Sequence, residues 1–287
     1  MGHIPQWIRV GALSPRDSEK LRTLLDSSSL HTVCEEASCP NIKECFSNGT
    51  STFLILGQIC TRECRFCGIR KGVPLPINPK EADDIALAVH RLDLDYVVIT
   101  SVARDDLPCG GARHFARTIS AIRSAMPKSL IEVLIPDFNG NEIALESIIA
   151  ERPAVINHNL ETVPRVFPHI RRGADYCRSL QLLSHIKMKD SGILTKSGIM
   201  LGLGETIKEV IHCLHDLRSV GCDILTLSQY LQPSPRQVNV ARYVAPEMFS
   251  YLKTIAFNFG FKAVASGPLI RSSYKALHMY RRAHCQD

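Results

Sequence analysis

The sequence predicts an α/β fold, a partial (β/α)6 TIM-like barrel whose mouth is closed by N- and C-terminal extensions. From about residue 50 onward, short apolar segments alternate with amphipathic helical patterns, as in a parallel α/β protein. The apolar segments are rich in β-branched residues and hydrophobic on both faces, which is typical of buried parallel strands. An open doubly wound sheet is the alternative, but no G-x-G-x-x-G follows the first strand, which weakens its dinucleotide-binding version.

Each predicted element follows from its own local pattern. The strands are expected at 52–56, 96–100, 131–135, 154–157, 197–201, 224–228 and 262–266. Apolar residues recurring every three or four positions predict helices at 79–92, 111–126, 141–151, 205–221 and 246–260. The last two of these helices end in glycine, a common helix stop.

These elements divide the chain into three predicted regions. Residues 1–50 form an N-terminal extension, residues 51–268 the partial barrel, and residues 269–287 a C-terminal extension that contains "RSSY". The basic run at 280–284, "YRRAH", is expected to be a solvated tail.

The composition excludes several classes of protein. The 287 residues are 45% hydrophobic and 22% charged, which is neither a disordered nor a membrane composition. No apolar run approaches the ~18–20 residues of a membrane-spanning helix, and "MGHIPQWIRVGAL" lacks a secretory signal pattern, so a cytoplasmic location is expected. The net charge of +6 is spread along the chain without a dense basic stripe, which favours an acidic protein partner or an anionic substrate over nucleic acid.

Cysteine is the most informative residue type. The chain has 11 cysteines, an odd number, and shows no secretion signal, so a disulfide framework is disfavoured. The scattered ones are expected to be small buried hydrophobic residues: Cys109, Cys177, Cys213, Cys222 and Cys285. The other six fall between residues 34 and 67, and this crowding indicates metal or cluster ligation.

The first cysteine group has the spacing C-x3-C-x2-C, formed by Cys60, Cys64 and Cys67. It begins four residues after the first predicted strand, on the face of a β/α barrel where catalytic residues gather. A structural zinc would need a fourth ligand, whereas three thiolates can hold three irons of a [4Fe–4S] cluster and leave the fourth iron open.

With Phe66 before its last cysteine, this motif resembles the signature of the radical S-adenosylmethionine superfamily. The resemblance implies a full or partial β/α barrel. It also implies that the open iron binds S-adenosylmethionine, whose cleavage gives a 5′-deoxyadenosyl radical that removes hydrogen from an unactivated C–H bond. We refer to the cluster expected on these three cysteines as the S-adenosylmethionine cluster.

A second group, Cys34, Cys39 and Cys45, has the spacing C-x4-C-x5-C, which matches no common ferredoxin pattern. Taken with the first group, it resembles the lipoyl synthase family. The resemblance covers almost the whole chain and includes, in order, the segments "CPNIKECFSNGTSTFLILG", "VVITSVARDDLPCGGA", "EVLIPDFNGN", "INHNLETVPR", "TKSGIMLGLGET", "QYLQPS" and "SGPLIRSSY".

That resemblance implies a second cluster, which we call the auxiliary cluster. Its ligands would be the second cysteine group and Ser273 of the Arg271–Tyr274 motif, with Ser272 as the alternative serine. The family consumes this cluster as the source of two sulfur atoms, which are inserted at C6 and C8 of a protein-bound octanoyl-lysine. A serine oxygen is a harder and weaker iron ligand than a thiolate, which suits a cluster that must come apart.

Partners are implied in the same way. They are octanoylated carrier proteins (lipoyl domains of 2-oxoacid dehydrogenases and the glycine-cleavage H protein), an electron donor such as ferredoxin or flavodoxin, and iron–sulfur carrier proteins. Lipoyl domains are commonly acidic, which suits the positive net charge.

Polar residues after the predicted strands are candidate contacts for S-adenosylmethionine. Asp105 and Asp106 follow the second strand and would bind the methionine ammonium or a ribose hydroxyl, or else cap their own loop. Further candidates follow later strands: Asn159, Glu161, Arg178, Gly202, Gly204 and Glu205. The glycines lie where a strand ends and a helix begins, a place where backbone approaches ligands, although a plain turn is equally consistent.

The sequence also departs from the family pattern in places and leaves competing functions open. Lys275 stands where histidine is common, Cys109 where an acid is usual, and Gln58–Ile59 where Asp-Thr is common. One competing function is a radical enzyme with other chemistry, such as biotin-synthase-like sulfur insertion. The other is a non-catalytic electron-transfer protein, which would need strong thiolate ligands at every iron.

Overall fold

The structure is a computed structural model that describes residues 5–8, 30–36, 39, 41 and 52–285. The chain forms two compact units. The C-terminal unit comprises Met1–Gly11, Cys64–Cys67 and Val155–Asp287, and the N-terminal unit comprises Ala12–Glu63 and Gly68–Ala154.

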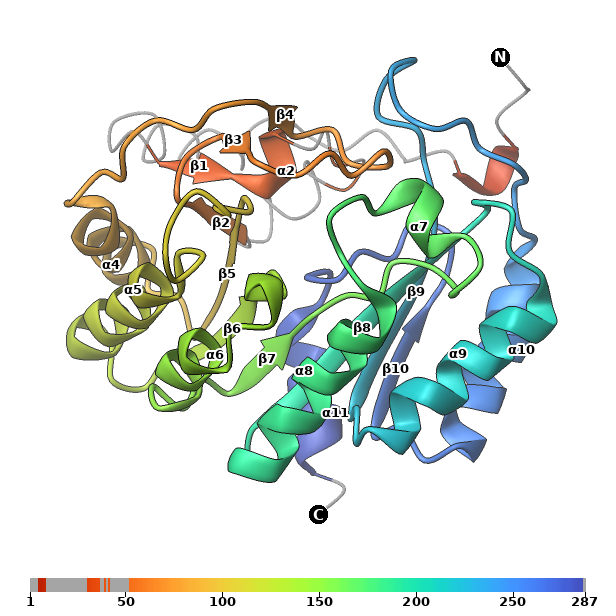
Figure 1. The fold of residues 1–287 in the computed structure, drawn as a ribbon. Helices are drawn as coiled ribbons and strands as arrows, with labels where there is room; N and C mark the ends of the chain where they lie inside the picture. The colour runs from red at the N-terminus through yellow and green to blue at the C-terminus, as the bar shows by residue number, and fades with distance from the viewer. Residues whose placement is uncertain (1–4, 9–29, 37–38, 40, 42–51, 286–287) are drawn as a thin grey trace. The chain divides into compact units, whose positions relative to one another are not determined.

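The sheet of the N-terminal unit has the strand order β1-β2-β5-β6. Its strands are β1 (His31–Thr32), β2 (Thr52–Ile55), β5 (Tyr96–Ser101) and β6 (Leu130–Leu134). β1 is antiparallel to β2, and the other neighbours are parallel. Helices α4 (Glu81–Arg91), α5 (Ala112–Ala125) and α6 (Glu142–Ile149) pack in series and bury the sheet (Figure 1). The strand residues are mostly buried and apolar, as predicted, with Thr100 and Glu132 as buried polar residues among them.

Smaller elements surround this sheet. Helix α2 (Val33–Glu36) follows β1, and the short helix η3 (Phe138–Gly140) follows β6. A separate parallel pair joins β3 (Ile59–Cys60) to β4 (Arg70–Lys71), with Cys60 opposite Lys71.

The C-terminal unit has a parallel sheet in the order β7-β8-β9-β10. Its strands are β7 (Val155–Asn157), β8 (Leu194–Leu201), β9 (Ile224–Gln229) and β10 (Ala263–Ser266). Its helices are η1 (Gln6–Ile8), α7 (Phe167–Ile170), α8 (Tyr176–Lys189), α9 (Ile207–Ser219), α10 (Pro246–Asn258) and α11 (Ala276–His284).

Local chemistry sets the helix ends. Asp175 caps α8 by accepting from the backbone nitrogen of Arg178. Thr206 and Glu209 form a reciprocal capping box at the start of α9. Gly221 and Gly260 follow α9 and α10 with φ of 82° and 91°, so the predicted glycine stops are confirmed.

Seven predicted strands and five predicted helices are present, which confirms the α/β alternation. The prediction of a solvated tail at 280–284 is wrong. These residues belong to α11, which packs against β10, and Met279 and Ala283 are buried against Val155, Leu194 and Ile224. Among the described residues, no helix combines the length and the apolar character that crossing a bilayer requires.

Candidate active site

Cys60 is the last residue of β3, and its backbone is fixed by pairing with β4. Its Sγ accepts backbone N–H bonds from Arg62 and Ala103, each at 3.4 Å, and its carbonyl accepts one from Gly72 at 3.1 Å. N–H bonds to sulfur stabilise negative charge on a thiolate and are one of the means by which proteins tune iron–sulfur clusters. The surroundings of Cys60 therefore fit a cluster ligand.

Cys64 and Cys67 belong to a short turn in the C-terminal unit. The backbone nitrogen of Cys67 donates to the carbonyl of Cys64 at 3.3 Å. Arg65 lies between the two cysteines, and its backbone nitrogen donates to the carbonyl of Ile170 at 2.8 Å. The Gln237 side chain donates to the carbonyl of Cys67 at 3.3 Å. Both thiols, like that of Cys60, are half-buried and form no disulfide.

Soft thiolates in partly exposed positions are a donor set that suits iron–sulfur ligation. Within the described ranges, no group of three or more His, Cys, Asp or Glu side chains is arranged to hold a metal ion. Cluster ligation by Cys60, Cys64 and Cys67 therefore stays a prediction from the motif.

Cys34 and Cys39 lie in and just after α2, where the nitrogen of Cys39 donates to the carbonyl of Cys34 at 2.9 Å. Burial, together with the nearby Cys39, raises the pKa of the Cys34 thiol to about 11. Without metal, Cys34 is therefore a protonated thiol at neutral pH, and ligation would release its proton. Cys45, the third predicted ligand of this group, lies outside the described residues.

Ser272 and Ser273 occupy the turn between β10 and α11 and are half-buried. The turn is closed by the nitrogen of Tyr274, which donates to the carbonyl of Arg271 at 3.0 Å. Lys275 then begins α11 with a positive φ of 52°. The serine pair thus sits on a turn held by a folded helix, and the choice of Ser273 as ligand stays a prediction.

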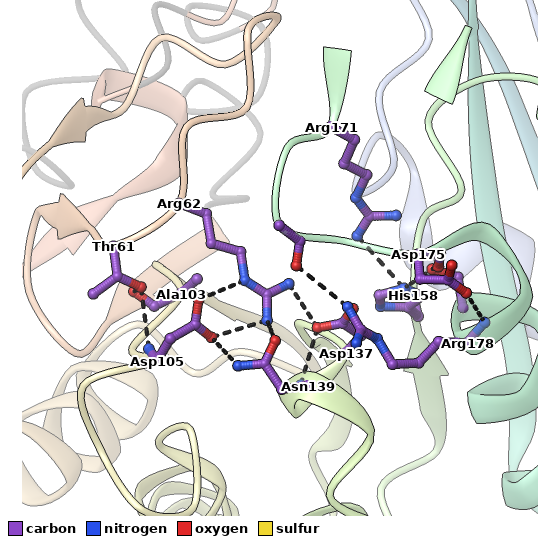
Figure 2. Close-up of polar contacts among 12 residues, drawn as sticks. Thr61, Arg62, Ala103, Asp105, Asp137, Asn139, His158, Arg171, Asp175 and Arg178 are labelled. Atoms are coloured by element: carbon purple, nitrogen blue, oxygen red, sulfur yellow. Dashed lines mark hydrogen bonds and ion pairs between the residues drawn. The ribbon is translucent and has the colours of Figure 1, made fainter. Parts of the chain in front are cut away.

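Asp105 and Asp106 are both paired with arginines (Figure 2 draws Asp105). Asp105 contacts Arg62 at 2.7 Å, and Asp106 contacts the buried Arg104 at 2.8 Å. The hydrogen bond from Arg104 holds the pKa of Asp106 below its usual range. The structure thus places both carboxylates in ion pairs of the protein itself.

The loop after β7 contains buried polar groups with spare hydrogen-bonding capacity. Asn159 donates to Glu161 at 3.1 Å. Its own Oδ1 and both side-chain polar atoms of Asn157 are buried with no hydrogen-bond partner in the described chain. Burial raises the pKa of Glu161, and the nearby Arg171 opposes this shift. Buried unpaired amide atoms are costly, so these groups are candidates for contact with a polar ligand.

The remaining candidates are held by local contacts. Arg178 is half-buried at the start of α8 and donates to the carbonyl of Gly173 at 3.2 Å, as part of the α8 cap region (Figure 2). Glu205 is buried, and its carboxylate accepts from the nitrogens of Gly202 and Leu203, both at 2.8 Å. Gly202 and Gly204 have φ of 98° and 105°, which explains why glycine is needed in this turn.

The scattered cysteines divide by burial. Cys213 and Cys222 are buried, as predicted, and burial raises the pKa of Cys213 to about 12. Cys109 is half-buried. The same prediction is wrong for Cys177 and Cys285, which are exposed near the start of α8 and just after α11. Each lies two residues from a buried position of its helix, Ser179 and Ala283 respectively.

Comparison with known proteins gives the decisive observation. A lipoyl synthase of Caldanaerobacter subterraneus subsp. tengcongensis is 52% identical over 272 residues, which cover 95% of this chain and 95% of the relative. A lipoyl synthase of Methylococcus capsulatus is 53% identical over 95% of this chain and 85% of the relative. The chain belongs to the lipoyl synthase family.

Membership of the lipoyl synthase family is consistent with the wider matches. The family model for the radical SAM superfamily matches residues 54–217, which is more than half of the chain. The crystal structure of methylornithine synthase has a TM-score of 0.57 at 15% identity, covering 91% of this chain and 84% of that chain. Streptococcus suis SuiB bound to S-adenosylmethionine has a TM-score of 0.60 at 11% identity, covering 78% and 54%. At such identities these two structures bear on the fold alone.

These matches confirm the resemblance and the partial-barrel fold class predicted from the sequence. The protein is an enzyme of the lipoyl synthase class. The cofactors that this family implies are S-adenosylmethionine and [4Fe–4S] clusters, and the sequence contains two cysteine groups.

Proposed function

We propose that this protein is a lipoyl synthase that inserts two sulfur atoms, at C6 and C8, into a protein-bound octanoyl-lysine. The observation that carries this proposal is the 52% identity to a lipoyl synthase over 95% of both chains. When bound, the cofactors would supply one electron to S-adenosylmethionine and so a 5′-deoxyadenosyl radical able to remove hydrogen from an unactivated C–H bond. No side-chain base reaches such a hydrogen, whose pKa lies far outside the range of protein groups.

The protein's own residues would bind and orient these groups. Cys60, Cys64 and Cys67 would hold the S-adenosylmethionine cluster through three thiolates. The auxiliary cluster would be held by the cysteines of the N-terminal extension (1–50) and Ser273 of the C-terminal extension (269–287). The weaker serine oxygen would then mark the iron at which this cluster opens when its sulfur is used.

The eight candidate contacts to S-adenosylmethionine differ in availability. Asn159 and Glu161 lie beside buried amide atoms that have no partner in the described chain, so they are the first choice. Both backbone polar groups of Gly202 and the carbonyl of Gly204 already have protein partners, so these glycines would contribute close approach of the backbone to the ligand and few hydrogen bonds. The side chains of the other four candidates already have protein partners and rank lower: Asp105, Asp106, Arg178 and Glu205.

The substrate class is an octanoylated carrier protein. Within this class we propose lipoyl domains of 2-oxoacid dehydrogenases and the glycine-cleavage H protein, because an acidic domain suits an enzyme with a net charge of +6. An electron donor such as ferredoxin or flavodoxin, and iron–sulfur carrier proteins that rebuild the auxiliary cluster, complete the proposed set. The proposed location is the cytoplasm.

One anaerobic experiment tests the function. The protein is reconstituted with iron and sulfide, then mixed with S-adenosylmethionine, dithionite and an octanoyl-lysine peptide, and the products are followed by mass spectrometry. The expected peptide gains two sulfurs and loses two hydrogens while about two 5′-deoxyadenosines form, one for each C–S bond. Deoxyadenosine without sulfur in the peptide would overturn the substrate. No deoxyadenosine from protein carrying both clusters would favour electron transfer instead.

A further inference from the structure

A buried arginine follows Cys60 by two residues. Arg62 is only 6% exposed, and its guanidinium faces two carboxylates and an amide (Figure 2). Its Nη1 contacts Asp137 at 2.6 Å, and its Nε and Nη2 bind both oxygens of Asp105 at 2.7 and 2.9 Å. Nη2 also donates to Asn139 at 2.9 Å. We call these four residues the Arg62 clamp.

The clamp joins three segments that are far apart in the sequence. Arg62 belongs to the cysteine loop, Asp105 to the loop after β5, and Asp137 and Asn139 to the loop after β6. Asn139 also donates to Asp105 at 3.1 Å, so the two acceptor loops are tied to each other as well. A bidentate arginine–carboxylate pair fixes geometry more strictly than a single hydrogen bond.

Thr61 reinforces the same attachment through backbone groups. Its nitrogen and Oγ1 both donate to the carbonyl of Ala103, at 3.1 and 3.0 Å, and its Oγ1 accepts from the nitrogen of Asp105 at 3.1 Å. The Cys60 sulfur accepts hydrogen bonds from the N–H groups of Arg62 and Ala103. Arg62 lies in the cysteine loop and Ala103 in the loop after β5, and these are the two loops that Thr61 joins. Any shift between these segments therefore moves the donors on that sulfur.

We propose that Arg62 is a positioning residue for Cys60: it clamps the cysteine loop to the loops after β5 and β6 and thereby fixes the two N–H bonds to the Cys60 sulfur. This inference rests on the proposed function for the meaning of Cys60 as a ligand. It also gives Asp105 a role as the partner of Arg62 in place of a contact to S-adenosylmethionine. The guanidinium is surrounded by protein acceptors, so Arg62 acts through Cys60 and does not bind the substrate itself.

The test compares Arg62→Lys with Arg117→Lys. Lysine keeps the charge but cannot form the bidentate pair. Arg117 forms an exposed pair with Asp83 at 2.9 Å in the same unit, so its replacement controls for charge and handling. The double variant Arg62→Gln/Asp137→Asn removes the two most buried charges of the clamp together and serves if Arg62→Lys does not fold, because the one carboxylate then left without its arginine, Asp105, is the more exposed of the two.

Two readouts are measured on the full chain. The first is amide hydrogen exchange of residues 59–63 and 103–105 in purified protein, which requires no turnover. The second is the EPR spectrum of the reduced, reconstituted protein before and after addition of S-adenosylmethionine, together with the midpoint potential of that signal. We expect exchange in these segments to rise about tenfold or more in the Arg62 variants, and the EPR spectrum and potential to change because the N–H bonds to sulfur are altered.

Each outcome decides the inference. Faster exchange with an altered EPR spectrum in the Arg62 variants, and neither in Arg117→Lys, supports it. Exchange and spectra equal to those of the unmodified protein overturn it. If the unmodified protein shows no EPR response to S-adenosylmethionine, the proposed function fails, and the exchange comparison alone then decides whether Arg62 fixes the loop.

Discussion

The carboxylate of Glu205 accepts a hydrogen bond at 2.8 Å from the backbone nitrogen of Gly202, the residue that follows β8. A second bond of the same length comes from Leu203, so the side chain folds back onto its own loop. The carbonyl of Gly202 also accepts from the nitrogen of Ala241 at 2.8 Å. The glycine-rich turn is therefore a tightly bonded and rigid structure.

Replacing Gly202 by alanine should destabilise this turn strongly. A Cβ there would collide with the Gln229 side chain and lie 2.5 Å from the carbonyl oxygen of Arg242, at a φ of 98° that L residues rarely adopt. We expect a loss of about 3 kcal/mol or more in the free energy of unfolding, because strain and steric overlap add. Urea denaturation measures it.

Gly204→Ala is the matched control. Its φ of 105° carries comparable strain, but a Cβ would meet no atom within 4 Å. The expected cost is about 1–2 kcal/mol. Equal losses in the two variants would contradict the steric argument.

The capping box of α9 predicts a pH-dependent stability. Hydrogen bonds from Arg165 and Thr206 lower the pKa of Glu209 to about 2. Because this lies below the ordinary value of 4.5, the stabilisation is complete above about pH 4.5 and is lost as the pH falls towards 2. Glu209→Gln should therefore lower the Tm at pH 7, and the difference from the unmodified protein should shrink as the pH falls from about 4.5 to about 2.

Glu247→Gln controls for the loss of one negative charge. Glu247 lies in the first turn of α10, and the N-cap residue of this helix, Ala245, makes no side-chain hydrogen bond. Glu247 is therefore not part of a capping box. A Glu209→Gln effect on Tm that is independent of pH would mean that the carboxylate charge does not matter at this cap.

Removing Cys60 should remove one cluster. In Cys60→Ala, the S-adenosylmethionine cluster loses a ligand, so we expect about half of the iron and no 5′-deoxyadenosine. Cys213→Ala is the control, since this buried thiol lies in α9 away from both cysteine groups in sequence. Iron analysis and EPR measure the effect, and full iron content in Cys60→Ala would contradict the assignment.

The two serines of the "RSSY" turn can be separated by single substitutions. Ser273→Ala should abolish sulfur insertion while 5′-deoxyadenosine still forms, because only the auxiliary cluster is affected. Ser272→Ala removes one hydroxyl oxygen from the same turn and should retain sulfur insertion. The reverse result, measured by mass spectrometry of the peptide, would assign the ligand to Ser272.

The C-terminal helix should contribute to global stability. Met279 is 5% exposed and packs in the cluster of Val155, Leu194 and Ile224. Met279→Ala should cost about 2–4 kcal/mol through lost burial and the cavity left behind. His278→Ala, on the exposed side of the same helix, should cost less than about 0.5 kcal/mol. Calorimetry or urea denaturation distinguishes them, and similar losses would mean that α11 is not part of the folded core.

Local patterns of apolar residues explain which helices and strands could be predicted from the sequence. The parallel strands are buried on both faces and so appear as continuous apolar runs. The helix α11 buries mainly small residues, Ala276 and Ala283, around Met279, and its basic residues give it the appearance of a tail. Helix α8 was missed because two serines and two lysines dilute its apolar signal. Its buried residues nevertheless follow helical spacing: Ser179, Leu182, Leu183 and Ile186.

The site shows the same limit. The cysteine motifs can be recognised in a single sequence because the predicted ligands of one loop are close together in the chain. The partners of Asp105 are not readable in this way, since Arg62 is 43 residues before it and Asn139 is 34 residues after it. The pairing of β2, β5 and β6 in the sheet brings those loops together. From the sequence alone, a carboxylate placed after a strand was therefore equally compatible with a ligand contact and with an ion pair.

The bonds of Thr61 bear on how iron is acquired. Fixing the backbone of one residue costs about 1–2 kcal/mol of conformational entropy. In this protein Thr61 and its neighbours are immobilised against Ala103 and Asp105 by bonds that need no metal. The entropy of that segment is therefore lost when the chain folds, and under the proposed function Cys60 would meet iron as a preorganised donor. Under the proposed function, cluster assembly at this cysteine should show little delay from ordering the loop.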